Sequence, residues 1–312
     1  MNLVKKTLLN NNGAFLNKCC IKTAFAGKYK EKPEDTKFSA LYFNDMHGKK
    51  ATAKLAGLAS GVDSFMKQNN DGFVICTGDT LIGRESELGP KNKLLINFLN
   101  YLSEISNKHS RHENPLICAL GNHELDSGEV GLVKILVRAN FKVVATNLHL
   151  DDDSPIKACM DKTIFQSIVA EKNGHYYGFI GALPTDLRQR VSGGIDYLDK
   201  MNIGSFDKKS LPLRRKYAKL LAEGCDIDYI HKQQQKLNEK VFKDTVKQLQ
   251  NEVNRLTTED GVNKIILVSH LGFNKDIEAA KNTTGIDVII GGHSHTLIDG
   301  VAKGVNLVVN KE

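Results

Sequence analysis

The stretch Leu116-Ile-Cys-Ala-Leu-Gly-Asn-His-Glu124 joins a short apolar run to a polar cluster that follows it directly. A run of this length is typical of a strand that is buried on both faces of a parallel sheet. Four further apolar runs, each leading into a cluster that contains Asp or His, are residues 40–43, 73–76, 265–268 and 288–290. Because ligands gather at the carboxyl ends of strands in open α/β sheets, we expect the five clusters to meet at one rim.

Predicted helices lie between the first three of these strands. Residues 52–68 and 91–105 carry apolar side chains at helical spacing, and a third helix is predicted over residues 127–140 before a strand at 142–145. This strand–helix–strand rhythm predicts βαβ units around a mostly parallel sheet. Further on, an Asn-Gly pair at 173–174 separates two apolar runs, which predicts a hairpin and therefore a second sheet or an antiparallel edge.

The charge of the chain is concentrated at its beginning. Residues 1–37 hold eight Lys against three acidic residues, so they account for +5 of the net charge of +7. Asn and Lys interrupt the apolar stretch that a signal peptide over residues 1–26 would need. We therefore expect a flexible basic extension over residues 1–36 and one folded domain over 37–312. The near-neutral remainder gives little support for a nucleic-acid-binding surface.

Residues 185–261 are expected to form a helical insert in the domain. From Asp228 onward, apolar residues recur at gaps of three, four or seven, which is typical of an amphipathic helix. The favoured interpretation is a solvated helix that packs on the body through one apolar stripe. A cap over the site or a partner-binding helix is the alternative.

Membrane and disulfide classes are disfavoured. No apolar run approaches the roughly 20 residues that span a bilayer, so we expect a soluble chain. The six cysteines show no C-x-x-C spacing, which argues against a cysteine zinc site. Cys76 and Cys118 fall in predicted buried strands, and free thiols fit a reducing compartment. We expect a cytoplasmic location, with a periplasmic or secreted one as the alternative.

The polar clusters offer ligands for metal ions. Each cluster is weak evidence alone, because a single Asp or His after a strand is often a turn residue or a helix cap. Together they supply imidazole, carboxylate and amide groups, a mixture that suits Mn, Zn, Fe or Co rather than Mg or Ca. One ion takes about four to six ligands, and the clusters hold more than that, so two divalent metal ions are expected.

The ordered set of clusters resembles the calcineurin-like metallophosphoesterase superfamily, and within it the catalytic domain of bacterial 5′-nucleotidases of the 2′,3′-cyclic phosphodiesterase/5′-nucleotidase type. The resemblance extends from residue 38 to the region of residue 310. The blocks that carry it are Asn44–Gly48, Gly78–Asp79, Gly121–Asp126, Ser269–Gly272 and Gly291–Thr296. It implies a layered αββα fold, with mostly parallel central strands, a second mixed sheet and flanking helices.

The resemblance also implies a role for each site residue. The first metal ion would be bound by Asp45, His47, Asp79 and His295, and the second by Asp79, Asn122, His270 and His293. His123 would face the substrate as the general acid, with Asp126 orienting its ring. The implied reaction is hydrolysis of phosphate monoesters, with nucleoside 5′-monophosphates as the first expectation, by metal-activated water.

Several alternatives stay open at this point. The same chemistry serves other small phosphate esters, namely cyclic nucleotides and sugar phosphates, and also phosphoproteins or nucleic acids. A non-catalytic scaffold is disfavoured because every ligand position and His123 are filled. Members of the family usually carry a C-terminal domain that holds the nucleoside. We expect that domain to be absent from this chain, which ends just after a strand at 305–309. Three explanations stay open: the natural protein is truncated, the chain is part of a longer protein, or another surface binds the leaving group. We hypothesise that the 185–261 insert partly replaces the domain. The sequence does not indicate the oligomeric state.

Overall fold

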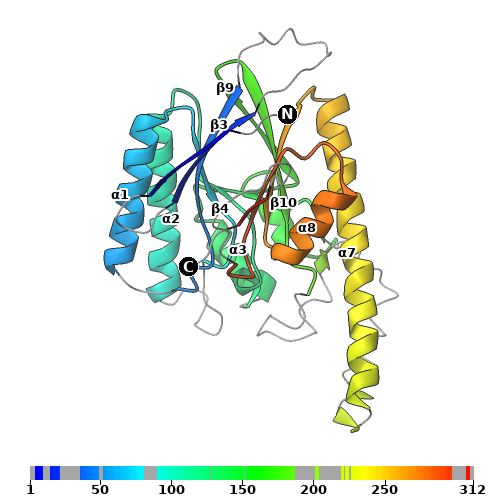
Figure 1. Cartoon of the computed structure of the whole chain (residues 1–312). Helices are drawn as coiled ribbons and strands as arrows, with labels where there is room; N and C mark the ends of the chain where they lie inside the picture. Colours follow the sequence, from blue (N-terminus) through cyan, green and yellow to red (C-terminus); the bar gives the residue numbers. More distant parts are fainter. Residues whose placement is uncertain are drawn as a thin grey trace.

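Two β-sheets face each other, with helices on both outer sides, in the computed structural model of the chain (Figure 1). This arrangement confirms the expected αββα fold. The structure describes residues 4–9, 15–21, 36–48, 52–80, 90–126, 128–150, 152–186, 201–203, 219–220, 222–224, 226–296 and 307–309.

The first sheet has seven strands in the order β1-β2-β3-β4-β5-β6-β8. Its strands are β1 (Val4–Leu9), β2 (Phe15–Ile21), β3 (Thr36–Phe43), β4 (Phe73–Cys76), β5 (Ile117–Cys118), β6 (Lys142–Val144) and β8 (Ile164–Phe165). From β3 to β6 the strands are parallel, as predicted. β8 pairs in parallel with β6, although its residues were expected in the antiparallel hairpin. β1 and β2, which the sequence analysis did not predict, pair antiparallel and extend the sheet beyond β3.

The second sheet has five strands in the order β14-β13-β12-β10-β9. Its strands are β14 (Leu307–Val309), β13 (Val288–Gly291), β12 (Lys264–Ser269), β10 (His175–Ala182) and β9 (Ser167–Lys172). The predicted hairpin is confirmed, because β9 and β10 pair antiparallel across Asn173 and Gly174. Both turn residues have positive φ, 55° and 81°, as a tight hairpin turn requires.

A small third sheet pairs β7 (Leu148–Leu150) with β11 (Met201–Ile203). β11 is a strand where the sequence analysis predicted a helical insert, and its partner lies some fifty residues earlier in the chain. Residues 187–200 and 204–218 of that insert lie outside the described residues.

The helices form the outer layers. Against the first sheet pack α1 (Thr52–Gln68), α2 (Pro90–His109) and α3 (Gly128–Leu136), and against the second pack α7 (Ile227–Thr258) and α8 (Phe273–Asn282) (Figure 1). Two short 3₁₀ turns, η1 (His123–Leu125) and η2 (Pro155–Cys159), lie in the connections.

Alternate residues of one strand enter different cores. Ile75 of β4 packs between the two sheets, whereas Val74 and Cys76 pack against the outer helices. In β12, Ile266 lies between the sheets and Ile265 packs under α7 and α8. Because both faces of these strands are buried, each strand appears in the sequence as an uninterrupted apolar run.

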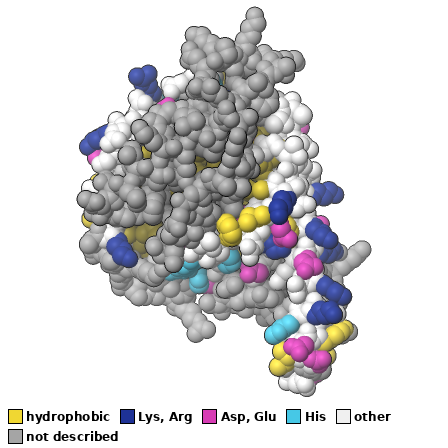
Figure 2. Space-filling model, viewed as in Figure 1, with side chains coloured by type: hydrophobic (Ala, Val, Ile, Leu, Met, Phe, Trp, Pro, Cys, Tyr) yellow, Lys and Arg dark blue, Asp and Glu magenta, His cyan; other side chains and the backbone are white. Residues whose placement is uncertain are grey.

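The long helix α7 is capped at its N-terminus by Asp226, whose carboxylate accepts hydrogen bonds from the backbone N–H groups of Asp228 and Tyr229. Towards its C-terminal end, Phe242, Leu249 and Val253 are buried in the core on the second sheet, which confirms the predicted apolar stripe. Its N-terminal end projects beyond the sheets with charged side chains of both signs along it (Figures 1 and 2). None of the helices among the described residues combines the length and hydropathy needed to cross a bilayer.

Candidate functional site

The five polar clusters meet at one rim of the two sheets. They follow the carboxyl ends of β3, β4 and β5 in the first sheet and of β12 and β13 in the second. Backbone hydrogen bonds tie neighbouring loops together: Asp45 N–H donates to Gly78 O at 3.0 Å, and His47 N–H donates to Asp79 O at 2.9 Å. Histidine side chains are visible at the lower edge of the molecule (Figure 2).

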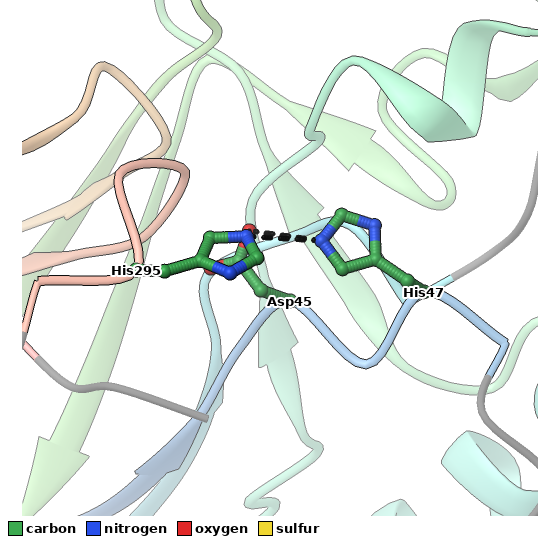
Figure 3. A group of neighbouring side chains, drawn as sticks. All are labelled: Asp45, His47 and His295. Atoms are coloured by element: carbon green, nitrogen blue, oxygen red, sulfur yellow. Dashed lines mark hydrogen bonds and ion pairs between the residues drawn. The ribbon is translucent and has the colours of Figure 1, made fainter.

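One cluster of ligand-type side chains joins the two sheets. Asp45 and His47 come from the loop after β3, and His295 comes from the loop after β13. Asp45 Oδ1 lies 3.2 Å from His295 Nε2 and 3.7 Å from His47 Nε2, and the two ring nitrogens lie 3.1 Å apart. The three side chains thus converge on one point (Figure 3). An arrangement of two imidazole nitrogens and a carboxylate oxygen within 4.8 Å can hold a metal ion.

A second cluster lies beside the first. Its members are Asp79 after β4, His270 after β12 and His293 after β13. The Nδ1 of His270 lies 2.5 Å from the carbonyl oxygen of Thr77, which can only accept, so Nδ1 carries the proton. Its Nε2 is therefore directed into the site, 3.1 Å from Asp79 Oδ2. A histidine held through one ring nitrogen with the other facing carboxylates is typical of metal ligands.

Two buried acceptors in the site lack donors. Within the described part of the chain, neither Asn122 Oδ1 nor Asp45 Oδ1 accepts a hydrogen bond. Asn122 and Asp45 are 3% and 1% exposed, so water does not compensate from the surface. An unpaired buried oxygen costs roughly 1–3 kcal/mol. A cation would satisfy both atoms, so the residues present fit a metal-binding site.

His123 and Asp126 form a separate pair at the edge of the site. The ring Nδ1 of His123 lies 2.6 Å from Asp126 Oδ2, and this bond keeps the proton on Nδ1 of the neutral ring. The imidazole packs edge-on against that of His47, with centroids 5.0 Å apart. Ligand-type atoms of His123, His47 and Asp79 also lie within 4.8 Å of one another, a spacing that could hold a metal ion. The resemblance instead implied that His123 faces the substrate.

The backbone at the rim is strained. Five of the seven described non-glycine residues with positive φ are predicted ligands: Asp45 (52°), His47 (45°), Asp79 (54°), His293 (74°) and His295 (51°). Such conformations cost about 1 kcal/mol or more each and persist only where surrounding contacts hold them. Their concentration at the rim indicates a functional site rather than ordinary loops.

Two glycines allow the loops to approach closely. A Cβ atom at Gly121 would lie 2.1 Å from Asp79 Oδ1, and one at Gly292 would lie 2.6 Å from Thr77 Oγ1. Only glycine leaves room for the neighbouring loop at these positions. Gly292, which directly precedes the two histidines, therefore allows close packing of the two sheets at the rim.

The electrostatics of the rim favour a cation. Burial alone would lower the pKa of His270, but the charge and hydrogen bond of Asp79, together with Asp45, raise it to about 9. Burial would raise the pKa of Asp79, yet His270 and the His123 N–H lower it overall. Burial lowers the pKa of His47. The buried carboxylates thus create a negative field that a proton on His270 balances when no metal ion is bound.

All nine residues predicted from the sequence lie in these loops, and the structure places each at the same rim. Two acidic residues to which the sequence analysis gave no role lie there as well. Asp186 Oδ1 is 3.6 Å from His293 Nε2, and the Glu124 carboxylate binds backbone amides of two loops. Glu124 stands inside one of the quoted blocks, which was the one available signal, whereas no pattern distinguished Asp186.

Comparisons with known proteins agree with this geometry. The family model for calcineurin-like phosphoesterases matches residues 38–297. The chain is 26% identical to the probable 5′-nucleotidase of Treponema pallidum (strain Nichols) over 306 residues, which cover 91% of the chain and 41% of that protein. It is 49% identical to the trifunctional nucleotide phosphoesterase protein YfkN of Bacillus subtilis (strain 168) over 72 residues, 23% of the chain and 5% of YfkN.

A solved structure shares the fold. The crystal structure of a 5′-nucleotidase precursor from Thermus thermophilus superposes with a TM-score of 0.58 at 21% identity, covering 88% of this chain and 45% of that one. The chain therefore spans less than half the length of each of these relatives. The match to the family model across most of the chain and the shared fold place it in a family: the chain belongs to the calcineurin-like phosphoesterases.

Proposed function

We propose that this chain is a metal-dependent hydrolase of phosphate monoesters and that nucleoside 5′-monophosphates are its substrates. The observation that carries the proposal is the meeting of Asp45, Asp79, Asn122, His270 and His295 at one rim, with buried acceptors directed into it. Family membership supports the reaction class, and the names of the 5′-nucleotidase relatives support the substrate class.

Two divalent ions of the Mn, Zn, Fe or Co type are proposed at the rim. The first would be held by Asp45, His47, Asp79 and His295, and the second by Asp79, Asn122, His270 and His293. Bound divalent ions neutralise phosphoryl charge and make water a better nucleophile at neutral pH. The mixture of imidazole, carboxylate and amide donors supports this class of ion.

His123 is proposed as the general acid. Its hydrogen bond to Asp126 raises the pKa of the imidazole above its ordinary value, which favours the doubly protonated ring. Asp126 fixes Nδ1, which leaves Nε2 as the atom that gives its proton to the departing alkoxide oxygen. The side chain of His123 is 31% exposed whereas that of Asp126 is 1% exposed, which suits an acid that reaches substrate and a buried partner that orients it.

A wider range of nucleotide esters is the second candidate. One relative is named a trifunctional nucleotide phosphoesterase, and the matched segment shares 49% of its residues with this chain. A two-metal site with a separate proton donor would also open a cyclic phosphodiester, because that reaction needs the same protonation of a leaving oxygen.

We further propose that residues 37–312 form the catalytic domain.

A substrate panel tests the proposal. The purified chain is assayed for phosphate release from nitrophenyl phosphate, nucleoside 5′-monophosphates and a sugar phosphate, and for opening of 2′,3′-cyclic nucleotides to the nucleoside monophosphate by chromatography, with Mn²⁺ and separately with EDTA. We expect Mn²⁺-dependent hydrolysis that is greatest with nucleoside 5′-monophosphates. Greatest activity on cyclic nucleotides would favour the second candidate. A lack of metal-dependent hydrolysis of any ester would contradict both.

A further inference from the structure

Glu124 occupies a buried position between two loops of the rim. It lies in the η1 turn directly after Asn122 and His123, and it is 8% exposed. Its carboxylate accepts three backbone hydrogen bonds. Oε2 accepts from Asp79 N–H at 2.9 Å and from Gly121 N–H at 2.7 Å, and Oε1 accepts from Thr80 N–H at 2.7 Å.

These amides belong to loops that follow neighbouring strands. β4 and β5 pair in parallel up to Cys76 and Cys118, and Ala119 N–H still donates to Cys76 O at 2.8 Å. Beyond that point the Glu124 side chain links the loop of Asp79 to its own loop. Glu124 thus continues the connection between the two strands into the region where the candidate ligands stand.

The side chain of Asp79 in turn binds the backbone of the loop that carries Glu124. Its Oδ1 accepts the backbone N–H of His123 at 2.9 Å, while its own N–H is held by Glu124. The two acidic side chains therefore bind each other's loop reciprocally. This exchange fixes the separation between Asp79 and His123.

The energetics favour a positioning role. Asp79 has φ of 54°, a strained conformation for a residue with a side chain, and such a conformation persists only where surrounding contacts hold it. Hydrogen bonds to a charged acceptor are roughly twice as strong as those between neutral groups. The bonds from the backbone N–H groups of Asp79 and of the following residue, Thr80, to Glu124 therefore hold the backbone of Asp79 in this conformation.

Only an ionised carboxylate satisfies all three amides. A carboxylate offers acceptors on both oxygens, whereas a glutamine amide offers one oxygen and two N–H donors. In Glu124→Gln, the amide nitrogen would face either Thr80 N–H or the pair formed by Asp79 and Gly121. One loop would lose its link and meet a donor instead of an acceptor.

We propose that Glu124 is a positioning residue that holds the Asp79 loop and the Asn122–His123 turn in the geometry that binds metal. The proposal rests on the proposed function for the identity of the site. The Glu124 carboxylate binds the backbone amides of these loops, so it acts on the site through Asp79 and His123.

The test compares two buried glutamates. Glu129 in α3 is 4% exposed and accepts from Ser154 Oγ at 2.7 Å, a partner outside the set of candidate ligands. Glu124→Gln and Glu129→Gln both neutralise a buried, hydrogen-bonded carboxylate. Mn²⁺ affinity of the metal-free protein is measured by calorimetry, and amide hydrogen exchange of Asp79, Thr80 and Gly121 is measured by NMR without metal.

We expect Glu124→Gln to weaken Mn²⁺ binding by about tenfold or more, which is typical when an outer partner of a ligand is lost, and to speed exchange of at least one of the three amides. Glu129→Gln is expected to keep wild-type affinity. Wild-type Mn²⁺ affinity in Glu124→Gln, or an equal loss of affinity in Glu129→Gln, would overturn the proposal. If Glu124→Gln does not fold, Glu124→Asp, which is too short to reach all three amides, takes its place with the same criteria.

The outcome separates this inference from the proposed function. A wild-type chain that hydrolyses esters, with a Glu124→Gln variant that binds Mn²⁺ normally, contradicts the positioning role alone. A wild-type chain that binds Mn²⁺ but hydrolyses no ester, with weakened binding in Glu124→Gln, contradicts the proposed function alone. The exchange measurement on metal-free protein is independent of both metal binding and activity.

Discussion

The backbone N–H of His293 donates to Asp45 Oδ2 at 3.0 Å, although the two residues lie 248 positions apart in the chain. Asp45 follows β3 of the first sheet and His293 follows β13 of the second. This hydrogen bond joins the two sheets at the rim, and it holds one oxygen of Asp45 while the other faces the imidazoles of His47 and His295. The candidate site therefore depends on how the two sheets pack.

Replacing His123 separates proton transfer from metal binding. His123→Ala is expected to retain Mn²⁺ affinity and to lower kcat for the best ester by roughly 10²–10⁴, the contribution of a general acid. His109→Ala is the control, because His109 forms a similar pair with Asp63 at 2.7 Å on the outer helices. Steady-state kinetics and calorimetry on both variants provide the measurement. Near-wild-type turnover in His123→Ala would remove this residue from the mechanism.

Replacing candidate ligands should change metal content. We expect His293→Ala to lose one metal ion per chain and Asp79→Asn, which alters the shared carboxylate, to lose more. His231→Ala on the projecting part of α7 is the control, since that histidine lies on an exposed stretch of the helix. Metal content after Mn²⁺ loading and desalting is measured by elemental analysis. Full metal content in both ligand variants would contradict the assigned ligand set.

Adding a methyl group at Gly121 should disrupt the rim selectively. In Gly121→Ala the new Cβ would lie 2.1 Å from Asp79 Oδ1, so the two loops must separate. Metal affinity is expected to fall by at least about tenfold, as for other changes to the support of a ligand. Gly57→Ala in α1 is the control, because its Cβ would meet no described atom within 4 Å. That variant should gain about 0.5–1 kcal/mol of stability by urea unfolding. A Gly121→Ala variant with normal metal affinity would show that the loops tolerate separation.

Lys172 gives a prediction about stability and pH. It is 3% exposed, donates to Ser110 Oγ at 2.7 Å and lies 5.4 Å from the centroid of the Phe73 ring. Burial lowers the pKa of Lys172 from 10.5 to about 8. Between these values the folded state binds fewer protons than the unfolded state, so the free energy of unfolding rises with pH there. Below pH 8 the cost of burying the charge is constant, at most roughly 3 kcal/mol.

Lys172→Met removes that cost. The variant should be more stable than wild type at pH 7, and its advantage should shrink as the pH rises towards 10.5. The lost bond to Ser110 reduces the gain. Urea unfolding at pH 7 and pH 10 measures the difference, with Lys67→Met, whose side chain is 60% exposed, as the control. An advantage of equal size at both pH values would contradict the lowered pKa.

Much of the fold could be predicted from the sequence because both faces of the central strands are buried. The runs at 73–76 and 288–290 correspond to β4 and β13 within one residue. Helix α1 begins and ends at the predicted residues, because its apolar stripe marks the face that packs on the sheet. The strands β1, β2 and β11 were not predicted. Lys and Asn interrupt the apolar pattern of β1 and β2, and β11 forms by pairing with β7, some fifty residues earlier in the chain.

The candidate site, like the fold, was determined partly by the sequence and partly by the tertiary structure. By itself, the sequence determined which residues could serve, because Asp, Asn and His at the ends of buried strands must lie at the rim of a parallel sheet. Only the tertiary structure decided how they meet: the contact of Asp45 with His293, the carboxylate of Glu124 between two loops, and the left-handed backbone of Asp79. These features depend on hydrogen bonds between segments distant in sequence, and such bonds exist only once neighbouring strands have paired and the two sheets have packed together.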